Sequence, residues 1–218
     1  MTQTADPFGV LRRVMQPRDR PRPGEVCEMC GEVVGEPHSH VASLSERRIM
    51  CTCRACYLLF TAQGAGARRL RAVPERVARA EDFSFSQAQW DDLAIPVDLV
   101  FLFQQSDLDD VDNPRKVVAC YPSPAGATES ELDLSSWAEI AAANPVLAGV
   151  EPDVEAVLVR RIGDGQFSCL VVPIDACYEL VGIVKQHWSG FSGGDEVWQH
   201  IDAFFAELLL RSGGSRRR

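Results

Sequence analysis

Residues 27–56 read CEMCGEVVGEPHSHVASLSERRIMCTCRAC, and this stretch decides the fold of the N-terminal third of the chain. It holds five of the eight cysteines, arranged as two Cys-x-x-Cys pairs with one extra cysteine before the second pair. Such pairs, joined by a hairpin, are a common framework for a tetrahedral thiolate site. The bound metal then replaces the hydrophobic core that so short a segment cannot assemble.

Four of these cysteines are predicted to bind the metal: Cys27, Cys30, Cys53 and Cys56. A Cys-x-x-Cys pair on a turn or helix chelates better than Cys-x-Cys, because alternate residues of an extended strand point to opposite sides. Cys51 is therefore expected to face away from the site. Cys51, His38 and His40 stay open as alternates that replace one of the four. The other interpretation of the two histidines is a solvent-facing pair before the first strand.

The predicted metal is zinc, because four thiolates without an open position are typical of structural zinc sites. The same ligand set holds iron in rubredoxins, which usually carry glycine after both pairs. Here Gly31 follows the first pair and Tyr57 follows the second, so iron is kept as the alternative. A redox-active thiol pair is less favoured, since no β-α context surrounds either motif. Three further cysteines lie in or beside apolar segments and are expected to be buried: Cys120, Cys169 and Cys177.

The chain divides into five predicted segments: a flexible arm (1–24), a metal-binding ribbon (25–63), an Arg-rich linker (64–80), an α+β domain (81–211) and a disordered tail (212–218). The arm is rich in proline and arginine and has no hydrophobic periodicity. Within the ribbon, weak alternation predicts a short hairpin with strands 40–44 and 47–52, followed by a helix from 54 to 62. The ribbon is thus expected to be a zinc-ribbon or rubredoxin-like module.

The larger segment is predicted to be a two-layer α+β domain. Its mainly antiparallel sheet is expected to contain strands near 97–105, 115–121, 155–162 and 166–173, the last two joined by the hairpin signal Gly163-Asp-Gly165. The near-continuous apolar run 97–103 predicts a central strand covered on both faces. Helices are expected after the capping box of Ser86 and Gln89, and at 136–143, 176–188 and 195–211. The last two are expected on one face of the sheet.

A loop of small residues, 121–128, has two interpretations. It lets a ligand or a partner backbone approach closely, or it is a rigid turn in which Thr128 caps the next helix. The sequence contains no Gly-x-Ser-x-Gly, P-loop or dinucleotide-binding motif, so no catalytic residue is predicted and an enzyme is disfavoured.

Targeting signals are not evident either. No apolar run approaches the roughly 18 residues of a membrane span, and no apolar segment follows Arg12-Arg13. The expectation is a cytoplasmic protein. Thiols stay reduced there, which favours metal over disulfides for the cysteine cluster.

Charge is distributed unevenly along the chain. Residues 1–80 contain 13 arginines against 8 Asp and Glu, whereas residues 81–211 contain 6 Lys and Arg against 23 Asp and Glu. The acidic body disfavours nucleic acid as its ligand, although the basic third leaves that role open for the ribbon alone. The split instead predicts that linker arginines contact an acidic protein partner or fold back on their own domain: Arg68, Arg69, Arg71, Arg76 and Arg79.

Several motifs occur in a fixed order: Cys-x-x-Cys-Gly, His-Ser-His, Cys-x-Cys-Arg-x-Cys, Tyr-Pro-Ser-Pro-Ala-Gly-Ala-Thr-Glu-Ser, Pro-Asp-Val-Glu-Ala and Pro-Ile-Asp-x-Cys-Tyr-x-Leu-Val-Gly. From Cys27 to Leu210 the chain resembles a bacterial, mainly actinobacterial family, led by a zinc ribbon, whose genes often sit beside those of a high-affinity uptake NiFe hydrogenase. The resemblance implies a non-enzymatic accessory protein that supports the hydrogenase by protein–protein interaction. The alternatives are a rubredoxin-like iron electron carrier for that enzyme and a zinc-ribbon regulator that binds nucleic acid.

Overall fold

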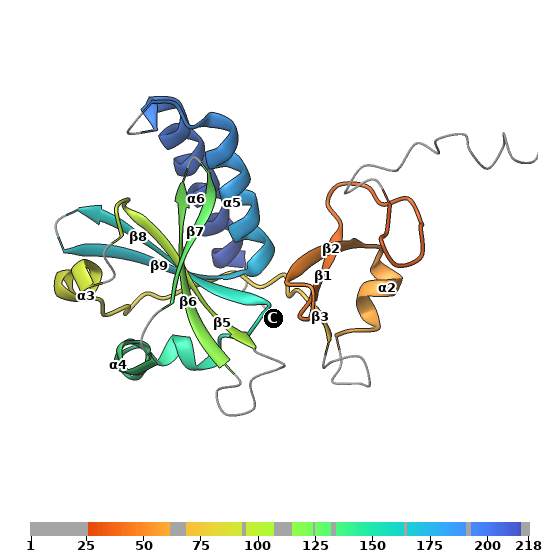
Figure 1. Cartoon of the computed structure of the whole chain (residues 1–218), viewed down its shortest axis with the longest axis horizontal. Coiled ribbons are helices and arrows are strands. Elements are labelled where there is room, and N and C mark those ends of the chain that lie inside the picture. The colour runs from red at the N-terminus through yellow and green to blue at the C-terminus, as the bar shows by residue number, and fades with distance from the viewer. Residues whose placement is uncertain are drawn as a thin grey trace, which may run out of the picture.

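Two antiparallel sheets organise the protein. The computed structural model describes residues 26–61, 69–92, 95–106, 115–123, 125–131, 134–163, 165–190 and 193–214. The predicted arm (1–24), the end of the predicted tail and the junction at 62–68 lie outside these residues. The described part contains a three-stranded sheet with order β2-β1-β3 and a six-stranded sheet with order β4-β9-β8-β5-β6-β7. Helices pack beside both, so the predicted α+β class is confirmed (Figure 1).

The smaller sheet belongs to what we call the cysteine module, residues 26–61 together with β3. The module contains β1 (Ser39–Ser43), β2 (Arg48–Thr52), α2 (Arg54–Leu58) and β3 (Leu70–Ala72). The predicted hairpin is confirmed by antiparallel pairing of β1 with β2. The helix, expected to reach residue 62, ends at Leu58. The module has a small core of its own, in which the partly buried Met29, Phe60, Leu70 and Ala72 pack against the buried residues Val41, Met50 and Tyr57.

The larger sheet contains all four strands predicted from the sequence. Its members are β4 (Ala78–Arg79), β5 (Leu99–Ser106), β6 (Arg115–Ser123), β7 (Gly126–Glu131), β8 (Glu155–Gly163) and β9 (Gln166–Pro173). The hairpin of β8 and β9 around Gly165 is confirmed. β5 lies between β8 and β6, and its alternate residues pack into two different cores. It is the predicted central, doubly covered strand.

Two long helices cover one face of this sheet, α5 (Ile174–His187) and α6 (Gly194–Gly214). Their apolar residues share one core with Leu99 and Phe101 of β5. The other face is covered by α3 (Gln87–Asp92), α4 (Leu134–Ala143) and the 3-10 helix η1 (Pro145–Gly149), which pack on Val100 and Leu102. The predicted capping box of α3 is present, because Ser86 N donates to Gln89 Oε1 (2.9 Å) and Gln89 N donates to Ser86 Oγ (3.2 Å).

The loop of small residues turned out to be a strand pair. The second strand was expected near 115–121, and one of two interpretations of the loop had Thr128 capping the next helix. β6 continues two residues further, to Ser123, and Thr128 lies within β7, which pairs with β6 at the edge of the sheet, so the capping interpretation was wrong. Pairing of β5 with β6 ends at Cys120, so Pro122 lies where β6 has one neighbour and a missing N–H is tolerated. Gly126, with φ +123, makes the tight turn.

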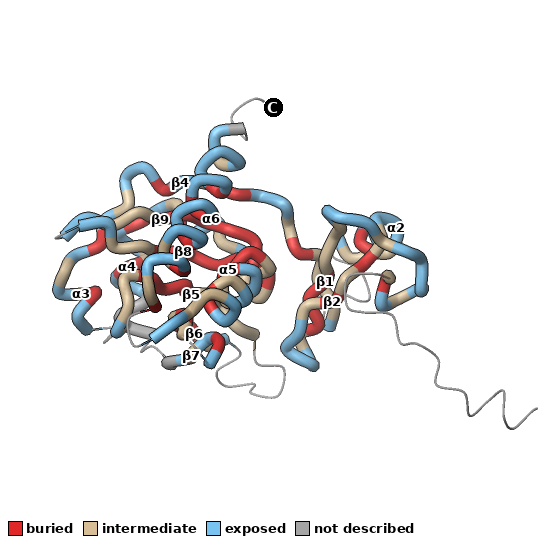
Figure 2. The backbone as a smooth tube through the Cα atoms, turned by 90° about the horizontal axis from the view of Figure 1, so that it is seen from above, coloured by how far each residue is buried: buried red, intermediate tan, exposed pale blue. Residues whose placement is uncertain are grey.

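The segment predicted as a linker joins the two sheets directly. Its residues 70–72 form β3 on the small sheet, and residues 78–79 form β4 on the large one. Between them, Val73 and Val77 are buried in the core under α5 and α6. Figure 2 shows these buried positions along the connection between the module and the α+β domain. Only part of the predicted linker therefore runs between the sheets.

Candidate metal centre

The first cysteine knuckle is a tight turn stabilised by backbone hydrogen bonds. Gly31 N donates to Cys27 O (2.8 Å), and Cys27 N donates to Glu32 O (2.7 Å). Gly31 has φ +77, a conformation that glycine adopts without a Cβ penalty. An antiparallel bridge between Val26 and Val33 closes the base of the turn. This geometry holds the sulfurs of Cys27 and Cys30 on one side of the chain.

The second knuckle opens helix α2. Cys53 follows strand β2 and occupies the N-cap position, where its Sγ accepts a hydrogen bond from Cys56 N (3.5 Å). Tyr57 N donates to Cys53 O (3.0 Å) and begins the helical hydrogen-bond pattern. Tyr57 itself packs into the module core. The helix therefore places Cys56 one turn after Cys53, with both sulfurs toward the first knuckle.

The four predicted cysteines come together: Cys27, Cys30, Cys53 and Cys56 have sulfur atoms that all lie within 4.8 Å of one another. Cys30 Sγ is 3.7 Å from Cys53 Sγ. A tetrahedral zinc ion with Zn–S bonds of about 2.3 Å places its sulfur ligands about 3.8 Å apart. The cluster thus matches a four-thiolate site in both ligand type and spacing, and the protein has a candidate metal centre there.

The three alternates form a cluster of their own. His38, His40 and Cys51 offer ligand atoms that all lie within 4.8 Å of one another. As predicted, Cys51 faces away from the four-cysteine cluster. The expectation of a solvent-facing histidine pair was wrong for His38, whose side chain is only 8% exposed. The reason is that the hairpin turns this face toward the α+β domain, where His40 Nδ1 donates to Asp175 Oδ2 (2.7 Å).

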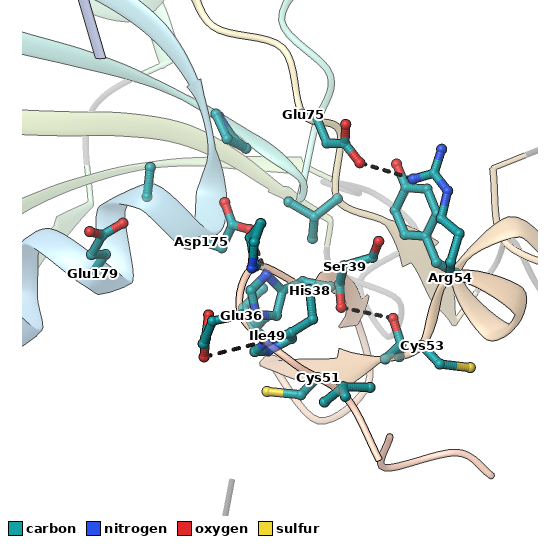
Figure 3. A pocket seen from close by; sticks show the side chains of 18 of the residues that line it. Glu36, His38, Ser39, Ile49, Cys51, Cys53, Arg54, Glu75, Asp175 and Glu179 are labelled. Carbon is teal, nitrogen blue, oxygen red and sulfur yellow. Dashed lines mark hydrogen bonds and ion pairs between the residues drawn. The ribbon is translucent and has the colours of Figure 1, made fainter. Parts of the chain in front are cut away.

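A cavity of about 1150 Å³ lies beside this second cluster, between the module and the α+β domain. Figure 3 shows His38 and Cys51 from the module facing the same region as Asp175 at the start of α5. Nothing in the local sequence singled out Asp175 as a site residue, because its contact with His40 spans 135 positions of the chain. A third cluster, His187, Glu196 and His200, lies at the far end of α5 and the start of α6.

A single family model spans both the cysteine module and the α+β domain. That family model matches residues 26–212, which includes all four cysteines and the histidine cluster. The chain belongs to DUF5947, a family of unknown function. Neither a curated protein nor a solved structure matches it. Among the described residues, no helix has the length and apolar character needed to cross a membrane.

Without metal, the thiols of Cys27 and Cys56 differ widely in pKa. Burial raises the pKa of the Cys27 thiol, but hydrogen bonds from the backbone of Cys53 and Cys30 outweigh burial and bring the pKa to about 6. Hydrogen bonding to the Cys30 and Cys53 thiols raises the pKa of Cys56 to about 12. Cys27 is therefore a thiolate at neutral pH and an initial point of attachment for a cation.

Zinc affinity of the four-cysteine cluster is expected to fall more steeply with decreasing pH below about pH 6 than above it. Above that pH, zinc displaces protons only from the other thiols, because Cys27 is already ionised. Below it, zinc must also displace the Cys27 proton. Competition titrations of the full chain across this range measure the slope of log affinity against pH. Cys51→Ser should show the same change of slope near pH 6. A single constant slope in both proteins would contradict ionisation of Cys27 above that pH.

Proposed function

We propose that this protein is a non-enzymatic accessory protein whose four cysteines hold a structural zinc ion and whose cysteine module binds another protein. The observation that carries the proposal is the clustering of Cys27, Cys30, Cys53 and Cys56 in a module with only three buried core residues. Four thiolates fill a tetrahedral coordination shell and leave no position for a substrate. Such an ion folds a module, which then acts through its surface.

Zinc is favoured over iron by the second knuckle. A rubredoxin-like site uses two glycine-containing knuckles, whereas here the position after Cys56 is Tyr57, inside helix α2 and buried in the module core. Glycine at this position would remove one of the three buried residues of that small core. The iron electron carrier is therefore the alternative function. A native protein that is red and contains iron would support it over the zinc protein.

Binding of a protein partner is supported by apolar side chains on the module surface. Leu58 and Leu59, at the end of α2, are 52% and 71% exposed, and Val33 beyond the first knuckle is also exposed. Two of the five linker arginines are less available than their charge suggests, and Arg68 lies outside the described residues. Arg71 donates to Glu151 Oε2 (2.9 Å), and Arg76 pairs with the buried Glu155. We therefore propose the leucines, rather than these two arginines, as partner contacts.

The proposed partner is a subunit or assembly factor of a NiFe hydrogenase. This identity rests on the resemblance to a family whose genes often sit beside those of an uptake hydrogenase. Nucleic acid is a weaker candidate, because Arg48, Arg54, Arg71 and Arg76 all pair with carboxylates of the same chain. Paired guanidinium groups contribute less to attraction of phosphate.

Co-purification and hydrogen uptake test this function together. We expect that Leu58→Glu combined with Leu59→Glu abolishes co-purification with the hydrogenase component and lowers hydrogen uptake to the level of a gene deletion. Bound zinc and thermal stability should not change, because both side chains are exposed. The matched control is Leu210→Glu, an equally exposed leucine on α6. Normal uptake in the deletion strain would contradict the hydrogenase link, and normal co-purification of the double variant would contradict docking through α2.

A further inference from the structure

We infer that His38, His40 and Cys51 form a second metal site, separate from the four-cysteine cluster, which holds a divalent transition-metal ion with one coordination position open to the cavity. This site goes beyond the proposed function, which needs only the structural ion. The described part of the chain supplies three ligands here, all within 4.8 Å of one another. Three protein ligands and one open position are typical of exchangeable or reactive metal sites.

Strand geometry brings the three side chains to one face of the hairpin. His40 of β1 lies directly opposite Cys51 of β2 in the antiparallel register. Side chains opposite each other in such a pair lie on the same face, with Cβ atoms about 4.5–5.5 Å apart. His38 precedes His40 by two positions, which extended backbone also places on that face. Its ring centroid is 4.7 Å from that of His40.

Hydrogen bonds fix both histidines in the form that binds a metal. His38 Nδ1 lies 3.2 Å from Gly35 O, and a carbonyl oxygen only accepts. Nδ1 therefore carries the ring proton, and Nε2 of the neutral ring carries a lone pair. His40 Nδ1 lies 2.7 Å from Asp175 Oδ2, so in the neutral ring its Nε2 likewise carries the lone pair. Both rings present the same unprotonated nitrogen.

The Nε2 atom of His38 is the observation that points to a missing ligand. It is buried, and it has no hydrogen-bond partner among the residues that the structure describes. The whole side chain is 92% buried, since only 8% of it is exposed. Leaving a buried polar atom unpaired costs about 1–3 kcal/mol. A metal ion bound to this nitrogen would remove that cost and would explain why a histidine is buried there.

The supporting contacts resemble those of known metal sites. A metal-binding histidine commonly donates its other ring N–H to a carboxylate, which fixes the ring and raises its basicity. Asp175 has this position behind His40. On the opposite strand, Cys51 N donates to Glu28 Oε1 (2.9 Å), and Glu28 is itself held by Arg48. The backbone that carries the cysteine ligand is therefore fixed as well.

The ligand set and the cavity define the class of ion. Imidazole and thiolate together suit zinc, cobalt, nickel and iron rather than magnesium or calcium. Nitrogen and sulfur ligands at about 2.0–2.3 Å from such an ion lie about 3.3–3.8 Å apart, so small side-chain rotations close the site. The cavity wall is mainly acidic and attracts cations, with carboxylates from Glu36, Glu75, Asp175, Glu179 and Glu207 against two guanidinium groups from Arg54 and Arg211.

Cobalt titration of the full chain tests this site. The protein is first loaded with about one equivalent of zinc to fill the four-cysteine cluster, and is then titrated with Co²⁺. We expect saturable binding of about one further ion, with tetrahedral ligand-field bands and a thiolate-to-cobalt charge-transfer band from one cysteine. Zinc retained in the same samples reports that the module is still folded. Absence of a second bound ion would overturn the inference.

Variants identify the ligands. Cys51→Ser should remove the charge-transfer band, whereas Asp175→Asn should keep the band and weaken cobalt binding by about 10–100-fold. His38→Gln should also weaken cobalt binding, and zinc retained by this variant shows that the effect is not unfolding of the module.

The matched control is His187→Gln with His200→Gln, which removes the third cluster and should leave the titration unchanged. A second ion lost in the control but retained in Cys51→Ser would overturn the site. Because zinc in the four-cysteine cluster is measured separately, failure here leaves the proposed function intact.

Discussion

Replacement of any one of Cys27, Cys30, Cys53 and Cys56 by serine is expected to release the structural metal and to unfold the cysteine module. The module's own core is small, with three buried residues and four partly buried ones, so much of its stability is expected to come from the metal. Binding of structural zinc contributes about 10–16 kcal/mol in comparable small modules, and that free energy is also their folding free energy. Metal analysis should show loss of the ion, and hydrogen exchange should show loss of protection in β1 and β2. Most residues of the two larger cores belong to the α+β domain, although Ala42 of β1 contributes to one of them, so the domain should remain folded.

Two other cysteines serve as controls for this experiment. Cys51→Ser changes a thiol in the same hairpin that faces away from the cluster, and Cys120→Ser changes a buried thiol in the larger domain. Both variants should keep the structural metal and the protection of β1 and β2. Equal loss of zinc in Cys51→Ser and Cys53→Ser would contradict the assignment of the second knuckle.

Replacement of Arg76 by alanine is expected to destabilise the fold by about 3–5 kcal/mol, because it leaves a buried carboxylate without its cation. Glu155 is 1% exposed and receives two hydrogen bonds from Arg76, at 2.9 Å from Nε and 2.6 Å from Nη2. Arg76 Nη2 also donates to Gly149 O (2.8 Å). The pair ties the connection between the two sheets to the start of β8. Chemical denaturation of the zinc-loaded full chain measures the loss.

The chain offers a matched control for this pair. Arg54 donates to Glu75 at 2.9 Å, but the two side chains are 62% and 74% exposed. Exposed ion pairs contribute about 0–1 kcal/mol, so Arg54→Ala should have little effect on stability. Combining Arg76→Ala with Glu155→Gln should recover part of the loss, because the buried charge is removed. Equal free energies of unfolding for Arg76→Ala and Arg54→Ala would show that Glu155 does not need its partner.

Local sequence signals predicted much of the fold. The Cys-x-x-Cys spacing indicated both knuckles, and Gly163-Asp-Gly165 indicated the hairpin of β8 and β9. The apolar run of β5 indicated a central strand, since alternate residues had to be buried on both faces. Prediction failed at β7, whose residues Gly-Ala-Thr-Glu-Ser-Glu carry little strand propensity. That strand forms because its neighbour β6 offers an unpaired edge, which is a tertiary effect.

The second cluster was partly accessible from the sequence. A hairpin turning at Ser45 and Glu46 places His40 opposite Cys51, and this register is a signal that groups the two residues with His38. Because alternate residues of a strand point to opposite faces, these three side chains lie on the face away from the four-cysteine cluster. Long-range partners were not accessible. Asp175 meets His40, and Glu155 meets Arg76, across 135 and 79 positions of the chain, and no local pattern records either pair.

Zinc X-ray absorption spectroscopy on the full chain, loaded with about one equivalent of zinc, tests most directly whether the four cysteines are the metal centre. We predict a first shell of about four sulfur atoms at about 2.3 Å and no lighter neighbour. The spectrum of Cys51→Ser should be the same, because its thiol lies outside the cluster. A first shell containing nitrogen or oxygen at about 2.0–2.1 Å would contradict the four-thiolate assignment.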